Sequence, residues 1–467
     1  MAAGTQNFWD FESWGFFNLL AVLLIALLFA NILKRKIGFL RKSLIPTSVL
    51  GGVLLLIPAM IYERITGASV FDTAFFGGNG ATNLEVLTYH ALALGFIAIT
   101  FRPSKEKFNR ERNIEIFNTG VTTVSTYLLQ GVVGLGITML WVLLFNSEFY
   151  SYAGVLLPFG FGQGTGQALN YGNLYESDYG FVGGKSFGLT VAALGFLSAS
   201  FGGVIYLNIM RLKKKIKPDD SNPEYKVLLS EEVQAADEIP MNGSIDKLTF
   251  QFVHIFSVYF VTYLLMMGLG KLLPNNQALV YGFNFLFAVI ITTIAKAGNT
   301  FLRKKKIINR QYISPFLMTR ISGLFFDIMI IAGIAAIRLS TIKDYWGVLL
   351  TMAVAGAIVT YFYNRFVAKK LFGKYQDEQF LAMYGMLTGT ASTGMILLRE
   401  IDSDFSSPAA DNLVYQNLPA IVFGFPMMFL GALAPKQPVL TFILLAAAFV
   451  VMNVLLFRKW LFKKKKK

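Results

Sequence analysis

Two glycine- and hydroxyl-rich segments carry the residues of this chain that are best suited to chemistry. The first, residues 160–167, reads GFGQGTGQ, and the second, residues 388–394, reads TGTASTG; each interrupts a hydrophobic stretch. Glycine lets a backbone unwind and approach a ligand closely. The amides of a helix that resumes after such a break favour an anion. Hydroxyls and freed carbonyls are hard oxygen ligands that suit Na⁺. The two segments therefore predict sites for an anion and a cation.

Each predicted role falls on particular residues. We predict that the first segment receives the anionic substrate and that the second holds the cation and polar groups of the substrate. The substrate-binding candidates are Gly162, Gln163, Gly164, Thr165, Gly166, Gln167, Thr390, Ser392, Thr393 and Arg320. The Na⁺ candidates are Thr388, Gly389, Thr390, Ser392 and Asp327. Neither segment carries a titratable side chain at its tip, which argues against proton relay by the tips themselves.

A structural role for the same glycines stays open. Gly160 with Gly164, and Gly162 with Gly166, have the spacing that lets helices pack closely. Packing alone does not explain two hydroxyl-rich breaks at corresponding places of the two halves. A nucleotide-binding loop is excluded, because the first segment lacks the P-loop lysine and the G-x-G-x-x-G spacing.

Charged residues inside hydrophobic stretches are rare and usually face a cavity or a partner. Arg320 and Asp327 lie seven residues apart, hence two turns along one helix face. Their expected partners are a substrate carboxylate and a cation, with a structural ion pair or an interfacial arginine as the open alternative. Lys185, Lys296 and Arg338 are predicted to anchor helix ends at the interface. For His90, which sits in a span, the alternatives are a proton site and a hydrogen bond between helices.

Composition places the chain in a membrane. Its 467 residues are 55% hydrophobic and 15% charged, and the apolar residues form blocks long enough to cross a hydrocarbon core of about 30 Å. Cysteine is absent and there are two histidines, so no metal centre and no cofactor other than a coupling ion are expected. The predicted spans are 15–33, 44–62, 83–101, 116–145, 181–210, 249–273, 279–297, 312–339, 346–366, 412–434 and 439–457.

The fold class that follows is an all-α, polytopic membrane protein. The first segment lies in a predicted re-entrant hairpin, residues 150–176, and the second lies in another, residues 379–402. We expect two inverted five-helix repeats, 1–210 and 248–434, each with one hairpin. A cytoplasmic linker, 211–247, joins them, and 435–467 adds one more transmembrane helix and a basic tail.

The basic residues fix the expected orientation. The net charge of +15 comes from 42 basic and 27 acidic residues. The basic clusters fall in alternate connections between spans rather than on one continuous surface, so nucleic acid is not an expected partner. By the positive-inside rule the clustered loops are cytoplasmic, the N-terminus is outside and the C-terminus inside. The first span begins after acidic residues and ends in Lys34, Arg35 and Lys36, so no cleavable signal peptide is expected. The terminal run Lys463–Lys467 is expected to contact anionic lipid.

Inverted repeats with matching helix breaks are typical of secondary transporters, which exchange the conformations of their halves around a central site. An ion channel with glycine-rich filter loops is the main alternative from another class. An intramembrane enzyme would need a close catalytic pair, and Asp327 is the one deeply placed carboxylate within the spans.

Several short motifs resemble those of the bacterial sodium/glutamate symporters. The matching segments are FGQGTG at 161–166, YGF at 179–181, IPTSVLGG at 45–52, LGFIA at 94–98, and the second hairpin at 385–394 with NLP at 417–419. The resemblance implies Na⁺-driven uptake of glutamate across a bacterial plasma membrane. It also implies a homodimer in which a transport domain moves like an elevator against a scaffold.

Departures from the family pattern limit what the resemblance implies about substrate. Phe161 stands where the family usually has glycine, and Gln163 stands where histidine is common. The second loop is richer in hydroxyls than is typical, and the last span is an addition. Glutamate is therefore the first expected substrate, followed by another amino acid or small carboxylate. Proton coupling through Asp327 or His90 is the alternative to sodium.

Overall fold

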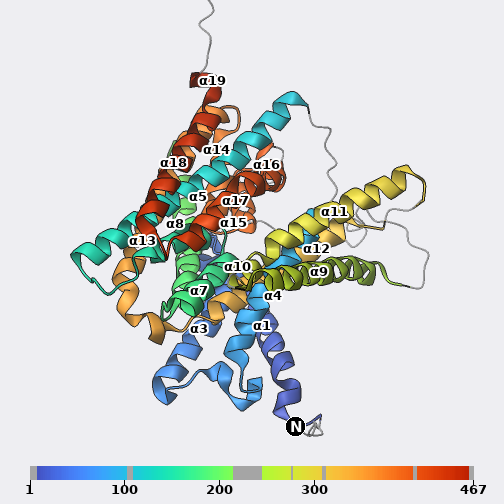
Figure 1. Cartoon of the computed structure of the whole chain (residues 1–467), viewed down its shortest axis with the longest axis vertical. Helices are drawn as coiled ribbons and strands as arrows, with labels where there is room; N and C mark the ends of the chain where they lie inside the picture. The colour runs from blue at the N-terminus through green and yellow to red at the C-terminus, as the bar shows by residue number, and fades with distance from the viewer. Residues whose placement is uncertain are drawn as a thin grey trace, which may run out of the picture. The chain divides into compact units, whose positions relative to one another are not determined.

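The computed structural model describes residues 8–101, 109–213, 245–274, 277–307, 312–402 and 407–461, and every regular element in these ranges is helical (Figure 1). Most of the predicted linker 211–247 and the lysine run 463–467 lie outside the described residues. The first half contains α1 (Phe11–Lys36), α2 (Gly38–Lys42), α3 (Thr47–Thr66), η1 (Val70–Asp72), η2 (Ala74–Phe76), α4 (Gly80–Phe101), α5 (Arg110–Leu144), η3 (Ser151–Val155), α6 (Leu156–Phe161), α7 (Thr165–Tyr179) and α8 (Gly184–Leu212). The second half contains α9 (Lys247–Leu272), α10 (Gln277–Gly282), α11 (Asn284–Lys304), α12 (Pro315–Ala335), η5 (Leu339–Tyr345), α13 (Trp346–Leu371), α14 (Gln376–Leu387), α15 (Ala391–Arg399), α16 (Ala409–Tyr415), α17 (Asn417–Leu433), α18 (Pro438–Leu456) and α19 (Arg458–Leu461).

The hydrophobic blocks become helices long enough to cross a bilayer. Among the described residues, ten helical segments have the length and hydropathy of a membrane span. An eleventh is present if α16 and α17, which are bent by 52° at their junction, form one span. The prediction of a multi-pass helical membrane protein is thus confirmed. The orientation, the inverted repeats and the entry of the hairpins into the membrane stay predictions.

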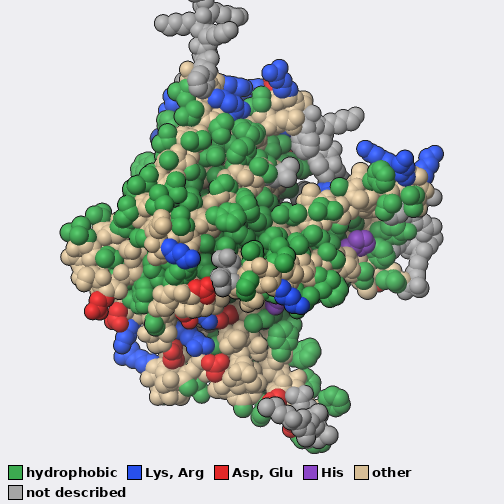
Figure 2. Space-filling view, viewed as in Figure 1, with side chains coloured by type: hydrophobic (Ala, Val, Ile, Leu, Met, Phe, Trp, Pro, Cys, Tyr) green, Lys and Arg blue, Asp and Glu red, His purple; other side chains and the backbone are tan. Residues whose placement is uncertain are grey.

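Many of these helices expose large apolar side chains, as expected for contact with lipid. On α18, Val439, Ile443, Val450 and Val454 are exposed. Figure 2 shows hydrophobic side chains over much of the face drawn. Because hydrocarbon tails solvate such side chains, helix association here depends on close packing and hydrogen bonds rather than on hydrophobic burial.

Packing divides the chain into two compact units. Unit 1 contains residues 1–86, 108–210 and 330–467, and unit 2 contains residues 87–107 and 211–329. Both glycine-rich breaks belong to unit 1. The division follows contacts and not chain order, so it leaves the predicted repeat boundaries as predictions.

Unit 2 is held together by aromatic contacts and a few hydrogen bonds. The ring of Phe96 packs against those of Phe285 and Phe326, at centroid distances of 5.2 and 5.6 Å. His90 shares a 2.6 Å hydrogen bond with the hydroxyl of Tyr259, as the structural alternative for this histidine predicts. Lys296 donates to the Thr100 carbonyl at 3.0 Å, so its ammonium group caps the end of a neighbouring helix.

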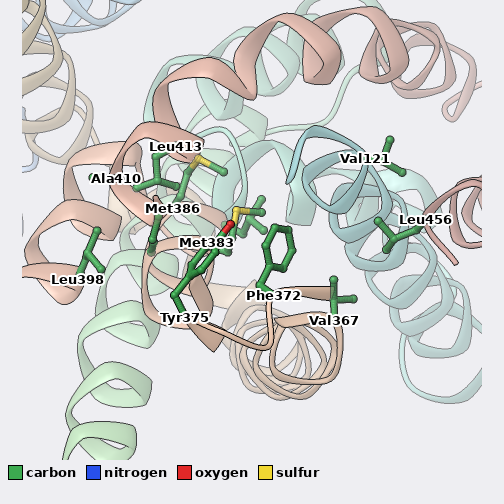
Figure 3. Packing of buried hydrophobic residues seen from close by; sticks show 13 residues of the cluster. Val121, Val367, Phe372, Tyr375, Met383, Met386, Leu398, Ala410, Leu413 and Leu456 are labelled. Atoms are coloured by element: carbon green, nitrogen blue, oxygen red, sulfur yellow. The ribbon is translucent and has the colours of Figure 1, made fainter. Parts of the chain in front are cut away.

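Unit 1 is built around α5, the longest helix. A buried cluster joins residues of α5, α13, α14, α15, α16 and α18, and Figure 3 shows its members, with Val121 of α5 beside Leu456 of α18. Helix α18 runs antiparallel to α5, with Leu445 against Gly131 and Phe442 against Gly136. The last predicted span is therefore part of the core of unit 1.

Two of the predicted interfacial anchors in unit 1 form ion pairs instead of standing alone. Lys185 lies 2.8 Å from Glu85 and also approaches Glu176 at 3.9 Å. Arg338 lies 3.7 Å from Asp72. Both pairs tie the start of a helix or loop to a neighbouring segment, so these cations also have a structural role.

Candidate functional site

The first break separates α6 from α7. Gly164 has φ of +80°, a conformation that side chains rarely adopt, and this lets the chain turn within residues 162–164. The first amide of α7 to donate within the helix is that of Ala168, to the Gly164 carbonyl. The amides of Gly166 and Gln167 precede it in the first turn, where helix geometry provides no intrahelical acceptor. Backbone amides in this position of a helix favour an anion, as predicted for this segment.

The second break, at residues 388–390, separates α14 from α15 in the same way. Thr390 is the N-cap of α15 and accepts at its carbonyl from the Gly394 amide. The two arms touch through glycines, since a Cβ at Gly385 would lie 2.8 Å from the Gly394 Cα. The predicted helix–break–helix arrangement is thus present in both glycine-rich segments.

The two breaks meet in space. A Cβ at Gly164 would lie 3.5 Å from the Thr390 Cγ2 and 3.7 Å from the Gly389 carbonyl oxygen. Gly164 and Thr390 are the N-caps of α7 and α15, so two helix N-termini come into contact. Each N-terminus carries a partial positive charge, and together they favour a negatively charged ligand at this junction.

Helix α5 holds both breaks through two side chains. Tyr127 donates its hydroxyl to the Gly162 carbonyl at 3.1 Å, and Gln130 donates its amide to the Leu387 carbonyl at 2.8 Å. The two residues are three apart and share one face of the helix. Gln130 also donates to the Thr360 hydroxyl of α13 at 2.9 Å. These bonds set the positions of both chain reversals relative to one rigid helix.

Helix α8 packs against both hairpins through a row of glycines spaced seven residues apart. Gly188 lies against Ala168 of α7 and Gly202 lies against Tyr384 of α14. At Gly195, between them, a Cβ would lie 2.6 Å from the Thr388 carbonyl oxygen and 3.0 Å from the Phe161 ring. Any larger residue at Gly195 would push the two breaks away from α8.

Gln167 presents a buried hydrogen-bond donor at the start of α7. Its side chain is 2% exposed, and its Oε1 accepts from Asn170 at 3.3 Å. Its Nε2 has no acceptor among the described residues. A buried amide nitrogen without a partner costs about 1–3 kcal/mol, and a ligand acceptor would remove that cost.

The predicted residues of the second break differ in exposure. Thr388 and Thr393 are buried, Thr390 is half-buried and Ser392 is exposed. The Thr388 hydroxyl donates to the Tyr384 carbonyl at 2.7 Å and keeps its oxygen lone pairs for another partner. In the first break Gln163 is half-buried, while Gly162, Gly164, Thr165 and Gly166 are buried.

Two buried amide oxygens on α5 and α13 also have no donor in the part of the chain that the structure describes. They are the Gln130 Oε1 and the Asn364 Oδ1, and both side chains are at most 2% exposed. Asn364 donates to the Thr360 carbonyl at 2.9 Å, so both amides converge on one residue of α13. No group of three or more His, Asp or Glu side chains able to hold a metal occurs within the described ranges. A cation near the breaks would therefore rely largely on neutral oxygens.

Arg320 and Asp327 lie on the part of α12 that belongs to unit 2. Arg320 is exposed, and its guanidinium lies 5.2 Å from the centre of the Phe316 ring. Asp327 is half-buried and has an interaction partner within the structure. Their participation in a site with the hairpins stays a prediction.

Some residues that shape this site are not among the sequence candidates. Tyr127 and Gly195 are recognised only once the breaks are in place, although the seven-residue spacing of Gly188, Gly195 and Gly202 is visible in the sequence. Gln130 is visible within its hydrophobic block, but nothing in the sequence links it to a particular carbonyl. The hydroxyls of Thr122 and Thr126 donate to the carbonyls of Asn118 and Thr122 in their own helix, so they are not free to serve as ligands through their protons.

Comparison with known families agrees with this arrangement. The family model described as sodium/glutamate symporter matches residues 14–406. The chain belongs to the sodium/glutamate symporter family. The match includes both breaks as well as α5 and α8, and it ends before α16. A search of curated proteins finds no significant match to this chain. Membership of this family implies that the protein is a transporter rather than an enzyme.

Proposed function

We propose that this protein is a secondary transporter that couples the uptake of glutamate, or of a similar small carboxylate or amino acid, to Na⁺. The observation that carries the proposal is the unpartnered Nε2 of Gln167, buried beside the junction of two helix N-termini. A carboxylate supplies the acceptor that this donor lacks and the negative charge that both helix ends favour.

In this proposal the substrate lies at the contact between Gly164 and Thr390. Amides of Gly166 and Gln167 receive a carboxylate, and polar groups of the second break, with the hydroxyls of Thr390, Ser392 and Thr393, hold the remainder. The family membership supports glutamate as the first substrate to test.

The coupling ion is proposed to bind on the carbonyl side of the second break. Its proposed ligands are the oxygens of Thr388, Gly389, Thr390 and Ser392. The donor-free oxygens of Gln130 and Asn364 are further candidates, because neutral oxygens suit a monovalent hard cation. The C-terminal end of α14 adds a partial negative charge there.

Transport is proposed to follow alternating access. We infer an elevator-like movement in a homodimer of the bacterial plasma membrane, with both breaks carried together because both are bonded to α5. Cross-linking of the protein in native membranes tests the dimer. Recovery of the monomer alone after cross-linking would contradict the dimer.

Uptake by purified protein in proteoliposomes tests the coupling. We expect glutamate accumulation under an inward Na⁺ gradient and none when K⁺ replaces Na⁺. Equal uptake in the two salts would remove the sodium coupling. Accumulation driven by a proton gradient without Na⁺ would favour the proton-coupled alternative.

The variant Gln167→Leu tests the binding site. Removing a hydrogen bond to a charged group costs about 1.5–3 kcal/mol, so we expect glutamate affinity to fall by roughly 10- to 100-fold. Asn173→Leu is the matched control, since Asn173 lies on the same helix and is exposed. Unchanged affinity in Gln167→Leu, with normal folding, would contradict the proposed substrate position.

A further inference from the structure

A second site is formed far along α5 from the breaks, where α5 begins and α18 ends. An open cavity of about 580 Å³ there is lined by Arg110, Asn113, Ile114, Phe117 and Arg458. The four residues of α5 have the spacing i, i+3, i+4 and i+7, so they form one stripe along the helix. Among the residues that the structure describes, no carboxylate lines the cavity.

The two arginines of the cavity are not neutralised by acidic side chains of the described chain. Arg458 donates to the Asn118 side chain at 3.2 Å and to the Leu455 carbonyl at 2.7 Å. Its guanidinium also stacks on Phe117, 4.9 Å from the ring centre. Arg110 is exposed at the first turn of α5. By contrast, Arg112 pairs with Glu115 at 3.1 Å and with Asp411 at 3.9 Å.

The position of the cavity identifies the kind of ligand. Both α5 and α18 are candidate membrane spans, so the start of one and the end of the other lie at a membrane surface. The arginines occupy that end, whereas Ile114 and Phe117 lie about one and two turns further into the span. Figure 2 shows Lys and Arg side chains gathered at the end of unit 1 near α19. Charge at the surface and apolar side chains below it match the two parts of a phospholipid.

We propose that this cavity binds the phosphate of an anionic phospholipid headgroup, with an acyl chain lying along Ile114 and Phe117. Arg110 and Arg458 bind the phosphate oxygens, and Asn113 donates a further hydrogen bond. Guanidinium groups bind phosphate through paired donors, which favours a fixed headgroup over a diffuse lipid layer. Arg458 comes from the part of the chain beyond the family match, so the site depends on the added helix.

Binding to the delipidated full-length protein in an uncharged detergent tests this site. The probes are phosphatidylglycerol, phosphatidylcholine and inorganic phosphate, followed by native mass spectrometry and thermal unfolding. We expect phosphatidylglycerol to bind and to raise the unfolding temperature, and the other two probes to do neither. Equal binding of both lipids would overturn the headgroup assignment. Binding of inorganic phosphate as tight as that of the lipid would reassign the cavity to a soluble anion.

Single substitutions distinguish lipid binding in this cavity from the general attraction of anionic lipid to basic segments. The lysine tail is kept in every variant. Arg110→Gln should weaken phosphatidylglycerol binding about fivefold, and Arg458→Gln should do so at least as strongly. Arg303→Gln, at the exposed end of α11, is the control and should bind as the parent does. Arg458 also packs inside unit 1, so Arg458→Gln could fail to fold. In that case the test rests on Arg110→Gln, because Arg110 is exposed. Parent-like affinity in folded Arg110→Gln would overturn the proposal.

Discussion

The two hairpins have the same helix–break–helix order but differ in the contacts that support them. In hairpin 1, which is formed by α6 and α7, the ring of Phe159 stacks on that of Tyr171, with centroids 3.7 Å apart and an interplanar angle of 7°. Tyr171 and Tyr175 each donate a 2.6 Å hydrogen bond to a carbonyl of α17. Thr165 to Gly172, the first half of α7, is buried throughout. Hairpin 1 is thus fixed by buried aromatic area and by tight packing against its neighbours.

Hairpin 2, formed by α14 and α15, combines buried apolar packing, including the stacking of Phe380 on Tyr384, with a network of polar side chains. Asn412 donates to Gln379 at 2.8 Å and to the Tyr375 hydroxyl at 3.2 Å, and it accepts from Arg112 at 2.7 Å. Gln379 in turn donates to Thr119 of α5 at 3.3 Å. Burial raises the pKa of the Tyr375 phenol above its ordinary value, so this hydroxyl stays protonated at neutral pH.

Helix α15, the second helix of hairpin 2, is also more exposed than the first half of α7. Ala391, Ser392 and Arg399 of α15 are exposed, whereas the corresponding first turn of α7 is buried. Segments with exposed side chains and few buried contacts open at the lowest free energy. The difference predicts that α15 opens more easily than the first half of α7.

The contact that the two hairpins share should give the largest effect. In Gly195→Val, the new side chain would overlap the Thr388 carbonyl and the Phe161 ring, so we expect destabilisation of about 3 kcal/mol and loss of uptake. Thermal unfolding and proteoliposome uptake measure both. Gly268→Val is the control, because no atom lies within 4 Å of a Cβ there. Similar behaviour of the two variants would show that the close contact at Gly195 does not matter.

A change in the polar network should affect hairpin 2 selectively. Asn412→Leu removes the donor to the Gln379 side-chain oxygen and to the Tyr375 hydroxyl, and the acceptor of Arg112, at a cost of about 2 kcal/mol. Hydrogen exchange should accelerate in α14 and α15 and stay unchanged in α7. Phe159→Leu is the counterpart in hairpin 1 and should accelerate exchange in α6 and α7. Faster hydrogen exchange in both hairpins of either variant would contradict the idea that each hairpin is stabilised by its own set of contacts.

The smallest structural effect is expected at the exposed tip of hairpin 2. Ser392→Ala removes an exposed hydroxyl and should change stability by less than about 0.5 kcal/mol. If the hydroxyl is a ligand as proposed, the Na⁺ concentration for half-maximal uptake should rise by several-fold. Ser177→Ala, an exposed serine of α7, should leave it unchanged. An unaltered Na⁺ dependence in Ser392→Ala would remove this residue from the ion site.

The sequence predicts the helices well because a membrane span requires one continuous apolar run. All of the predicted spans overlap helices, and both breaks fall at their glycines. Local signals of this kind do not tell which breaks touch. The contact of Gly164 with Thr390, and the bonds from Tyr127 and Gln130, join residues far apart in the chain, where no periodic pattern records the pairing. The place of α18 beside α5 is missed for the same reason, since its lipid-facing and α5-facing sides are equally apolar.

The bonds from Tyr127 and Gln130 have a mechanical consequence. Helix α5 bonds to the chain at both breaks, through residues less than one turn apart. A rotation of α5 would therefore displace both breaks together. If the breaks hold the anion and the cation as proposed, this shared support would couple the release of the two ligands and limit the leak of either one alone.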